Sequence, residues 1–271
     1  MHHVIPSRNA HSAMTPFLQM MQISGEQDGE SLAINEPVIF RFERPRERLI
    51  FYPAFRRNVA QELGQALASL SQAEETLPQA AAAVLGGARH FMFSTPHMVV
   101  RGDIGFDGRF NLYAVVTEDN PFRGALGQLG LQMSLLQELM AGAVKKQVGT
   151  LTIQHMSVTL PENIVMEMLK AGFEQPVQDP YNQGMKPRKI DGPLDMKMLT
   201  TEGEKAAGYK SKWARHVALP LLACLQSESP EEAEGKVKNI KADDWRRAMS
   251  DWLDAVIQAE AFKQETDGGE A

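Results

Sequence analysis

Residues 126–146 read LGQLGLQMSLLQELMAGAVKK, and this stretch decides the fold class that the sequence predicts. Leu, Met and Ala recur on most sides of the helix that it would form, so we expect a helix buried in the middle of the fold. Lys145 and Lys146 suit the C-terminal end of that helix, where the helix dipole favours positive charge. The sequence therefore predicts a fold arranged around one buried helix.

Strand patterns flank this helix on both sides. Before it, residues 97–104 and 109–116 are strand-like and are joined by Asp107-Gly108, a turn signal that predicts an antiparallel hairpin. After it, residues 150–160 read TLTIQHMSVTL, and their alternation of apolar and polar side chains predicts a single strand. Strands on both sides of a buried helix indicate an α/β domain with a sheet packed on that helix.

Further elements are predicted toward both ends of the chain. The N-terminal part is expected to contain helices at 12–24, 57–71 and 78–85 and strands at 37–42, 48–52 and 90–94. The C-terminal part is expected to contain a helix that starts at Pro161 and stops at Gly172, a loop at 174–193, a helix at 202–226, an acidic loop at 228–235, a helix at 242–264 and a frayed end at 265–271. Residues 1–173 are therefore the predicted core, and residues 174–271 a loop and helical part packed on the same domain.

Three side chains of the C-terminal part have predicted structural roles. Trp245 and Trp252 lie on one face of the last predicted helix and would dock it on the domain, the alternative being a stripe that binds a partner. Cys224 lies in the apolar run LPLLACLQ and is predicted to be a buried core thiol. As the single cysteine, it also excludes an internal disulfide and a multi-cysteine zinc site.

The composition is typical of a globular protein without a membrane span. Hydrophobic residues make up 43% of the 271 residues, and no apolar run approaches the roughly 18–20 residues that a transmembrane helix needs. The N-terminus, MHHVIPSRNAHSAM, has no basic start followed by an apolar stretch, so no signal peptide is expected. We therefore expect a cytoplasmic protein with no membrane partner.

The net charge of -6 gives the chain no general attraction for phosphate, so binding to a nucleic acid would need a local basic patch. The densest run of arginines consists of Arg41, Arg44, Arg46, Arg48, Arg56 and Arg57. On composition alone, the alternative is a solvated pair of strands around a turn.

The stretch from Asn120 to Pro161 contains a glycine turn at Gly124, the predicted helix and a second glycine turn at Val148-Gly149. In this order it resembles the central segment of thymidylate synthases and the related pyrimidine nucleotide hydroxymethylases. The resemblance runs from about residue 12 to residue 165. It implies a mixed sheet wrapped on a long buried central helix, a homodimer formed through that sheet, and a pyrimidine nucleotide or DNA as a further partner.

The resemblance also implies binding residues. The phosphate-binding arginines of the family resemble Arg46, Arg48, Arg56 and Arg57. Arg123 lies close in sequence to a further phosphate position, and Gln128 falls on the amide that reads the base. Glu62, in Glu-Leu-Gly-Gln, falls where the family has its catalytic glutamate.

The catalytic cysteine of the family has no counterpart in this chain. It follows a proline, whereas here His97 follows Thr95-Pro96. The family reaction needs a thiolate that adds to C6 of the pyrimidine, and imidazole is a poor substitute because the adduct must also leave. Four further positions depart from the family pattern: Thr117, Glu118, Thr159 and Pro161. A carboxylate at Glu118 would repel a phosphate, so conventional methyl transfer is not expected.

Three functions remain open at this point. The first is a non-catalytic relative that acts as a binding or scaffold component in pyrimidine nucleotide or DNA base modification, as in a phage gene set. The second is an enzyme with altered chemistry at C5 of a pyrimidine, with Glu62, His97 and Asp119 as acid/base groups. The third is a nucleic-acid-binding protein that uses the 41–57 arginines.

Each of the remaining candidate residues also has a structural interpretation. Glu62 is a solvated helix residue in that interpretation, His97 a structural histidine on a half-buried strand, and Gln128 a solvated or capping amide. No cofactor and no metal are predicted, because the sequence has no HExxH motif, no His-x-His pair and no glycine-rich phosphate loop.

Overall fold

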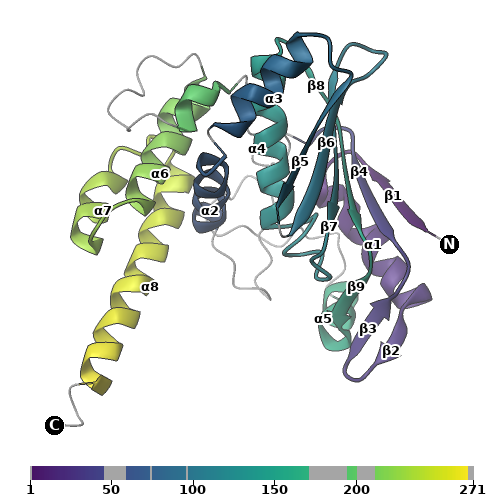
Figure 1. The fold of residues 1–271 in the computed structure, drawn as a ribbon. Coiled ribbons are helices and arrows are strands. Elements are labelled where there is room, and N and C mark those ends of the chain that lie inside the picture. The colour runs from purple at the N-terminus through teal and green to yellow at the C-terminus, as the bar shows by residue number, and fades with distance from the viewer. Residues whose placement is uncertain are drawn as a thin grey trace.

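The computed structural model describes residues 2–45, 59–73, 75–95, 97–170, 194–199 and 211–267. This part of the chain has a mixed α/β architecture, with a six-stranded mixed sheet, a small three-stranded sheet and α-helices (Figure 1). The predicted α/β class with a mixed sheet is confirmed. None of the described helices has the length and apolar character that a membrane span requires.

The six-stranded sheet has the strand order β1-β4-β8-β7-β6-β5. Its members are β1 (His3–Ser7), β4 (Val38–Phe42), β5 (His90–Thr95), β6 (Met98–Ile104), β7 (Phe110–Val116) and β8 (Val148–His155). The small sheet has the order β2-β3-β9, with β2 (Glu26–Asp28), β3 (Ser31–Ile34) and β9 (Val158–Pro161). Strands β7 and β8 are parallel, whereas β5, β6 and β7 pair antiparallel.

Helix α4 (Gln128–Ala143) connects the parallel strands β7 and β8, so these three elements form a βαβ crossover. Its residues 130–141 are all buried. The helix packs on the sheet on one side and on α2 (Val59–Ser71) and α3 (Thr76–Leu85) on another. The helix lies where layers meet, which explains why its sequence is apolar on most sides.

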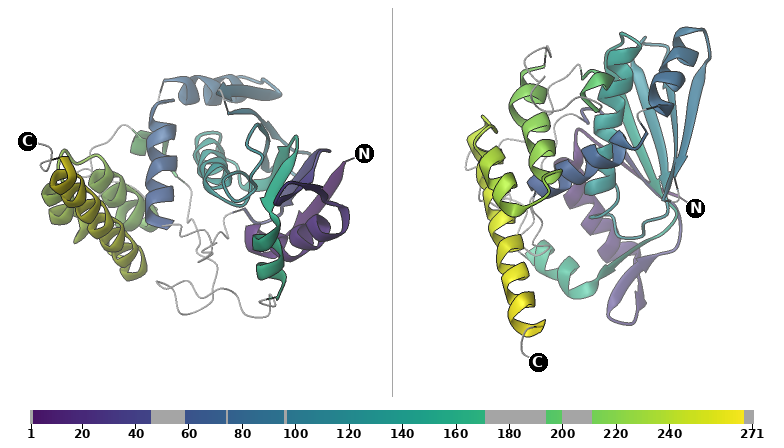
Figure 2. Two further views of the ribbon diagram at one scale, coloured as in Figure 1. Left: turned by 90° about the horizontal axis from the view of Figure 1, so that it is seen from below. Right: turned by 60° about the vertical axis from the view of Figure 1, so that its left-hand side comes forward.

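The remaining helices extend these layers. They are α1 (Ala10–Ser24), α5 (Glu162–Lys170), a 3-10 turn (Met196–Leu199), a π-helical turn (Ala214–Ala218), α6 (Leu219–Leu225), α7 (Pro230–Val237) and α8 (Asp243–Asp267). Helix α1 packs on the same sheet face through Phe17, whose ring centroid lies 5.4 Å from that of Phe40. Helices α6 and α8 contact α2 (Figure 2), so the C-terminal helices lie beyond α2 as seen from the sheet.

The two faces of the six-stranded sheet differ in burial. The inner face carries core residues such as Phe40, Val100 and Ile153, each with 0% exposure. On the opposite face, which we call the outer face, every described residue of the six strands is at least partly exposed. The outer face includes Val4, Ile39, Met92, Val99, Arg101, Tyr113, Val115, Thr152 and Gln154.

Most predicted elements in the described part of the chain are confirmed. Helices occupy 10–24, 59–71, 76–85, 128–143, 162–170 and 243–267, and the predicted hairpin of 97–104 and 109–116 is the β6–β7 pair. Trp245 is 7% exposed and Trp252 packs partly buried against the core, so their docking role is confirmed. Cys224 is buried, as predicted.

Two predictions about loops and strands are wrong. Residues 150–160 do not form one strand, because β8 ends at His155 and β9 starts at Val158 in the other sheet. The acidic segment 228–235 is not a loop, since α7 begins at Pro230. Ser229 caps that helix by accepting a hydrogen bond from the Glu232 N–H at 3.2 Å, and two acidic residues occupy its first turn.

The sequence prediction also missed several elements. Strand β1 and the hairpin β2–β3 were not predicted, and the terminal helix continues to Asp267 instead of fraying at 265. The predicted strand at 48–52 and the loop at 174–193 lie outside the described residues, as does the first part of the predicted helix at 202–226.

Candidate functional site

The loop 117–127 joins the carboxyl end of β7 to the start of α4, which is where α/β folds commonly bind ligands. It carries the candidate site residues Asp119 and Arg123, together with Thr117 and Glu118. The backbone N–H groups of residues 122–127, however, donate to acceptors within the protein. Those of Arg123 and Gly124 donate to the Asn120 carbonyl, that of Leu126 donates to Pro121, and that of Gly127 donates to Gly124.

Two side chains of the loop accept hydrogen bonds from further backbone N–H groups. The Asn120 carboxamide oxygen accepts from the Phe122 N–H at 2.9 Å, and a Glu118 carboxylate oxygen accepts from the Asn120 N–H at 3.0 Å. An anion site at a helix start needs free N–H groups that point at the ligand. In residues 122–127 each N–H already has an acceptor within the chain, so this turn is closed on itself.

His155, the last residue of β8, binds the backbone of the loop 117–127 through both ring nitrogens. Its Nε2 accepts a hydrogen bond from the Ala125 N–H at 3.0 Å, so the proton of the neutral ring lies on Nδ1, which donates to the Glu118 carbonyl at 2.6 Å. Burial lowers the pKa of His155 to about 4, although the Glu118 carbonyl and nearby Asp119 act in the opposite direction. The ring is therefore neutral near pH 7 and has a structural role.

Gly124 is the part of the loop that lies against this ring. A Cβ atom at Gly124 would be 2.0 Å from Cε1 and 2.6 Å from Nε2 of His155. Contact distances this short do not occur between real Cβ atoms and their neighbours, so the position requires glycine.

The structure brings several of the predicted positions together at this strand end. Thr117 donates to the His97 carbonyl from both its N–H, at 3.0 Å, and its hydroxyl, at 3.2 Å. The Thr159 N–H donates to the Asp119 carbonyl at 3.0 Å. His97, Thr117 and Glu118, three of the positions that depart from the family pattern, therefore lie at one end of the sheet, and Thr159 joins β9 to the loop there.

The candidate residues near this strand end differ in exposure. His97 lies in an exposed turn before β6, so the expectation of a half-buried strand position is wrong. Asp119 and Arg123 are exposed on the loop, whereas Gln128 is half-buried as the first residue of α4. No group of three or more potential metal ligands occurs among the described residues.

Glu62 belongs to another part of the molecule. It is half-buried in the first turn of α2. The hydrogen bond between α2 and the start of α4 joins Ser69 to Gln132, at 3.0 Å, near the other end of α2. Seven residues of helix separate Ser69 from Glu62, which is about 10 Å along the helix axis. The Ser69–Gln132 hydrogen bond thus places the C-terminal end of α2 beside the start of α4.

The predicted phosphate-binding arginines Arg46, Arg48, Arg56 and Arg57 lie outside the described residues. Of the same run, Arg41 and Arg44 are described and exposed, and Arg41 lies on the outer face of the sheet. The predicted role of this run in binding phosphate or nucleic acid stays a prediction.

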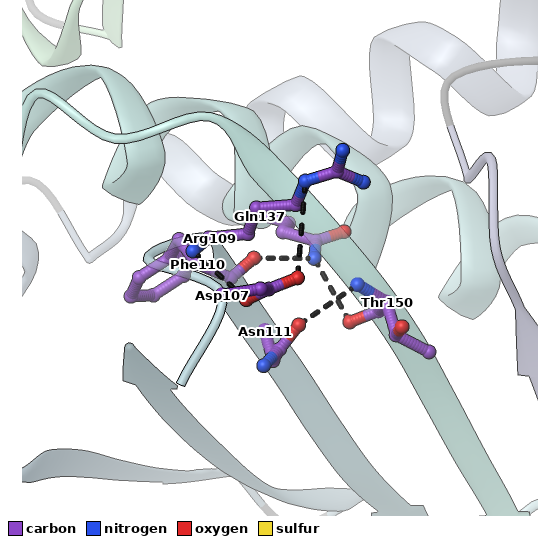
Figure 3. Close-up of polar contacts among 6 residues, drawn as sticks. All are labelled: Asp107, Arg109, Phe110, Asn111, Gln137 and Thr150. Atoms are coloured by element: carbon purple, nitrogen blue, oxygen red, sulfur yellow. Dashed lines mark hydrogen bonds and ion pairs between the residues drawn. The ribbon is translucent and has the colours of Figure 1, made fainter. Parts of the chain in front are cut away.

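The opposite end of the β7–β8 pair holds a second polar cluster (Figure 3). Gln137 of α4 donates from Nε2 to the carbonyl oxygens of Phe110 and Thr150, both at 3.0 Å. Asn111 accepts from the Thr150 N–H at 2.9 Å, at a position where the strand register shifts. These side-chain bonds replace the backbone ladder where the irregularity interrupts it.

Sequence reasoning did not single out His155 or Gln137. Both lie within apolar patterns, His155 at the end of an alternating strand and Gln137 in a buried helix. The available signal was polarity at a predicted buried position, because a buried polar side chain needs a partner.

Comparison with known proteins adds no assignment. A scan against models of protein families finds no match, and a search of curated proteins finds none.

Proposed function

We propose that this chain is a non-catalytic, divergent relative of the thymidylate synthases that acts as a binding or scaffold component in pyrimidine nucleotide or DNA base modification. The observation that carries the proposal is the closed loop 117–127. The N–H groups of residues 122–127 are satisfied within the chain. His155, the buried titratable group that holds this loop, is engaged at both ring nitrogens.

The residue types at this end of the sheet also support a function without methyl transfer. No cysteine is present here, because the single thiol, Cys224, is buried in α6. Burial raises the pKa of that thiol to about 11, so it is protonated at neutral pH and cannot serve as the nucleophile. The resemblance in sequence supports the fold family, and the absent thiolate supports a function without methyl transfer.

The scaffold role includes a homodimer through the outer face of the sheet. Val4 is 50% exposed, Met92 64% and Val99 44%, and no described element covers these side chains. Six strands about 4.8 Å apart and roughly 20 Å long present a face of the same order as the ~800 Å² per partner of a stable interface. A second copy would bury these apolar residues around Tyr113 and its hydrogen-bond partner Gln154.

Light scattering tests the dimer. The wild-type protein is expected to have twice the chain mass of 30.1 kDa, and Val99→Asp is expected to shift it to the monomer by burying an unpaired charge at the interface. Ile23→Asp is the matched control, because Ile23 is 82% exposed on α1 and lies off the sheet. A wild-type monomer would contradict the dimer and weaken the family assignment.

Turnover assays test the absence of methyl transfer. With dUMP and methylenetetrahydrofolate we expect no product, and any turnover that depends on the protein would refute the central proposal. A thermal-shift panel of dUMP, dCMP, dTMP and folates then identifies whether a nucleotide is bound, because a ligand that binds only the native state raises the melting temperature.

One observation favours an enzyme with altered chemistry at C5 as a second candidate. Thr117 is hydrogen-bonded to the His97 carbonyl, and the Asp119 carbonyl accepts from the Thr159 N–H, both near the carboxyl end of β7. Protein-dependent exchange of the C5 hydrogen of dUMP, abolished in His97→Ala or Asp119→Asn, would favour this candidate. Exchange at the rate of buffer alone would remove it.

A further inference from the structure

The amino ends of β7 and β8 lie at the opposite edge of the sheet from the loop 117–127. Three turns meet there, as the strand register shows. The β6–β7 hairpin tip lies between the turn before β5, since His90 pairs with Asp103, and the turn before β8, since Phe110 pairs with Val148. We call this edge the hairpin surface, defined by Arg89, Ile104, Phe106, Arg109, Lys145 and Lys146.

Phe106 lies in the tip of the β6–β7 hairpin. It is 115% exposed, which is the largest exposure among the exposed large hydrophobic residues of the described chain. The tip that carries it is well fixed. The Gly105 N–H donates to the Arg109 carbonyl and the Gly108 N–H to the Gly105 carbonyl, both at 2.9 Å, and Gly108 has the positive φ of 74° that this turn requires.

The polar cluster of Figure 3 contacts this tip and stabilises its conformation. Asp107 accepts from the Arg109 N–H at 3.1 Å, and Asn111 fills the space beside Gly105 and Gly149, where added Cβ atoms would be 2.5 Å and 2.2 Å from its side chain. Gln137 then anchors the start of β7 to α4. A fully exposed aromatic ring is thus held on a rigid support, which lowers the entropy lost when it binds.

The charges on the hairpin surface are unbalanced. The acidic residues at this edge are paired, Asp103 with Arg101 and Asp107 with Arg109, each at 3.8 Å. Arg89, Lys145 and Lys146 are exposed and have no ion pair within the described chain. Three uncompensated positive charges therefore flank the aromatic ring.

This positive edge is not in conflict with the acidic chain. Residues 226–271 contain twelve Asp and Glu against six Lys and Arg, whereas residues 1–225 contain 22 of each kind. The described part of that acidic segment, α7 and α8, lies beyond α2, across α4 from the sheet (Figures 1 and 2). The net negative charge is thus remote from the hairpin surface.

We propose that the hairpin surface binds single-stranded nucleic acid, with a base stacked on Phe106 and phosphates contacted by Arg89, Lys145 and Lys146. Binding of this kind combines cationic side chains with exposed aromatic rings that accept any base. An acidic peptide would satisfy the charges equally well. However, a peptide's apolar side chain gains most in a concave groove, whereas Phe106 stands on a convex tip with its ring in solvent.

Fluorescence anisotropy of the full chain with a labelled 15-nucleotide oligo(dT) tests the proposal. We expect Phe106→Ala to weaken binding about fivefold or more, and Phe106→Trp to retain it. With three phosphate contacts, each doubling of the salt concentration should lower the affinity about fourfold. The doubly substituted Lys145→Asn and Lys146→Glu protein should bind weakly, and asparagine suits position 145 because Lys145 has a φ of 54°.

Two controls separate this site from other sources of binding. Lys170→Glu makes the same reversal of charge as Lys146→Glu, but on α5, which follows β9 near the opposite end of the sheet, and is expected to bind like the wild type. A labelled poly-Glu peptide of similar charge should bind more weakly than the oligonucleotide. Unchanged binding by Phe106→Ala, no binding by the wild type, or preference for poly-Glu would each overturn the proposal. Circular dichroism of Phe106→Ala checks that the variant is folded.

Discussion

Gly124 lies so close to the imidazole of His155 that a single methyl group at this glycine would be 2.0 Å from ring carbon Cε1. The ring cannot move aside without cost, because both of its nitrogens hold the backbone of the loop 117–127. The two residues therefore fix each other's positions at the carboxyl end of β7 and β8.

Substituting Gly124→Ala should destabilise the protein by about 1–3 kcal/mol or more, because the added methyl group overpacks a rigid neighbour. The free energy of unfolding from urea titrations measures the effect. Gly235→Ala is the matched control, since a Cβ at this helical glycine meets nothing within 4 Å and alanine favours the helix. Equal stability of Gly124→Ala and the wild type would show that the loop can shift away from the ring.

His155 should make stability depend on pH between about 4 and 6.5. Its folded pKa of about 4 lies below the ordinary value of 6.5, so in this range the unfolded chain binds more protons than the native protein. Stability from this residue is complete above pH 6.5 and falls as the pH drops toward 4, by on the order of 3 kcal/mol in total.

The non-titrating variant His155→Gln tests this contribution. Urea titrations from pH 4 to pH 7 should show that the free energy of unfolding changes less steeply with pH in the variant than in the wild type. The difference in slope should correspond to the uptake of at most one proton on unfolding. Parallel curves for the two proteins would assign the acid sensitivity to other groups.

Gln137→Leu should destabilise the protein by about 2–5 kcal/mol, because the buried carbonyls of Phe110 and Thr150 both lose their side-chain donor. Chemical denaturation measures the loss. Gln147→Leu, at an exposed position in the turn before β8, is the control and should change stability by less than about 0.5 kcal/mol. A small effect at Gln137 would mean that water reaches these carbonyls.

Cys224 should be chemically inert in the native protein, since burial raises the pKa of its thiol to about 11. Ellman's reagent should modify it slowly at pH 8 and rapidly after unfolding in urea. Fast modification of the native protein would show that α6 opens readily.

Local signals in the sequence predicted much of the fold. The run at 126–146 indicates a buried helix because its apolar residues cover most sides, and Asp107-Gly108 marks the hairpin through the positive φ that glycine allows at Gly108. The start of α7 is also encoded, by the Ser-Pro-Glu-Glu at 229–232, although acidic residues and proline are equally common in loops. Serine before proline and two carboxylates is a helix start.

The candidate site was less predictable because its contacts are long-range. His155 binds Ala125 and Glu118, which are 30 and 37 residues away, and no local pattern encodes such pairs. The alternation at 150–160 gave a correct inward and outward pattern for β8 but no sign that the chain changes sheets after His155. Periodicity specifies which face is buried, and strand pairing decides which sheet a strand joins.

The passage of one chain segment from β8 into β9 has a mechanical consequence. Only Met156 and Ser157 separate the last residue of β8 from the first of β9, and Thr159 is tied in turn to Asp119. The small sheet is thus joined to the end of β8 through two residues and to the loop 117–127 through one hydrogen bond. A force that tilts β9 pulls on the loop 117–127 and on the end of β8 at once, so the three should loosen together when the protein is stretched or heated.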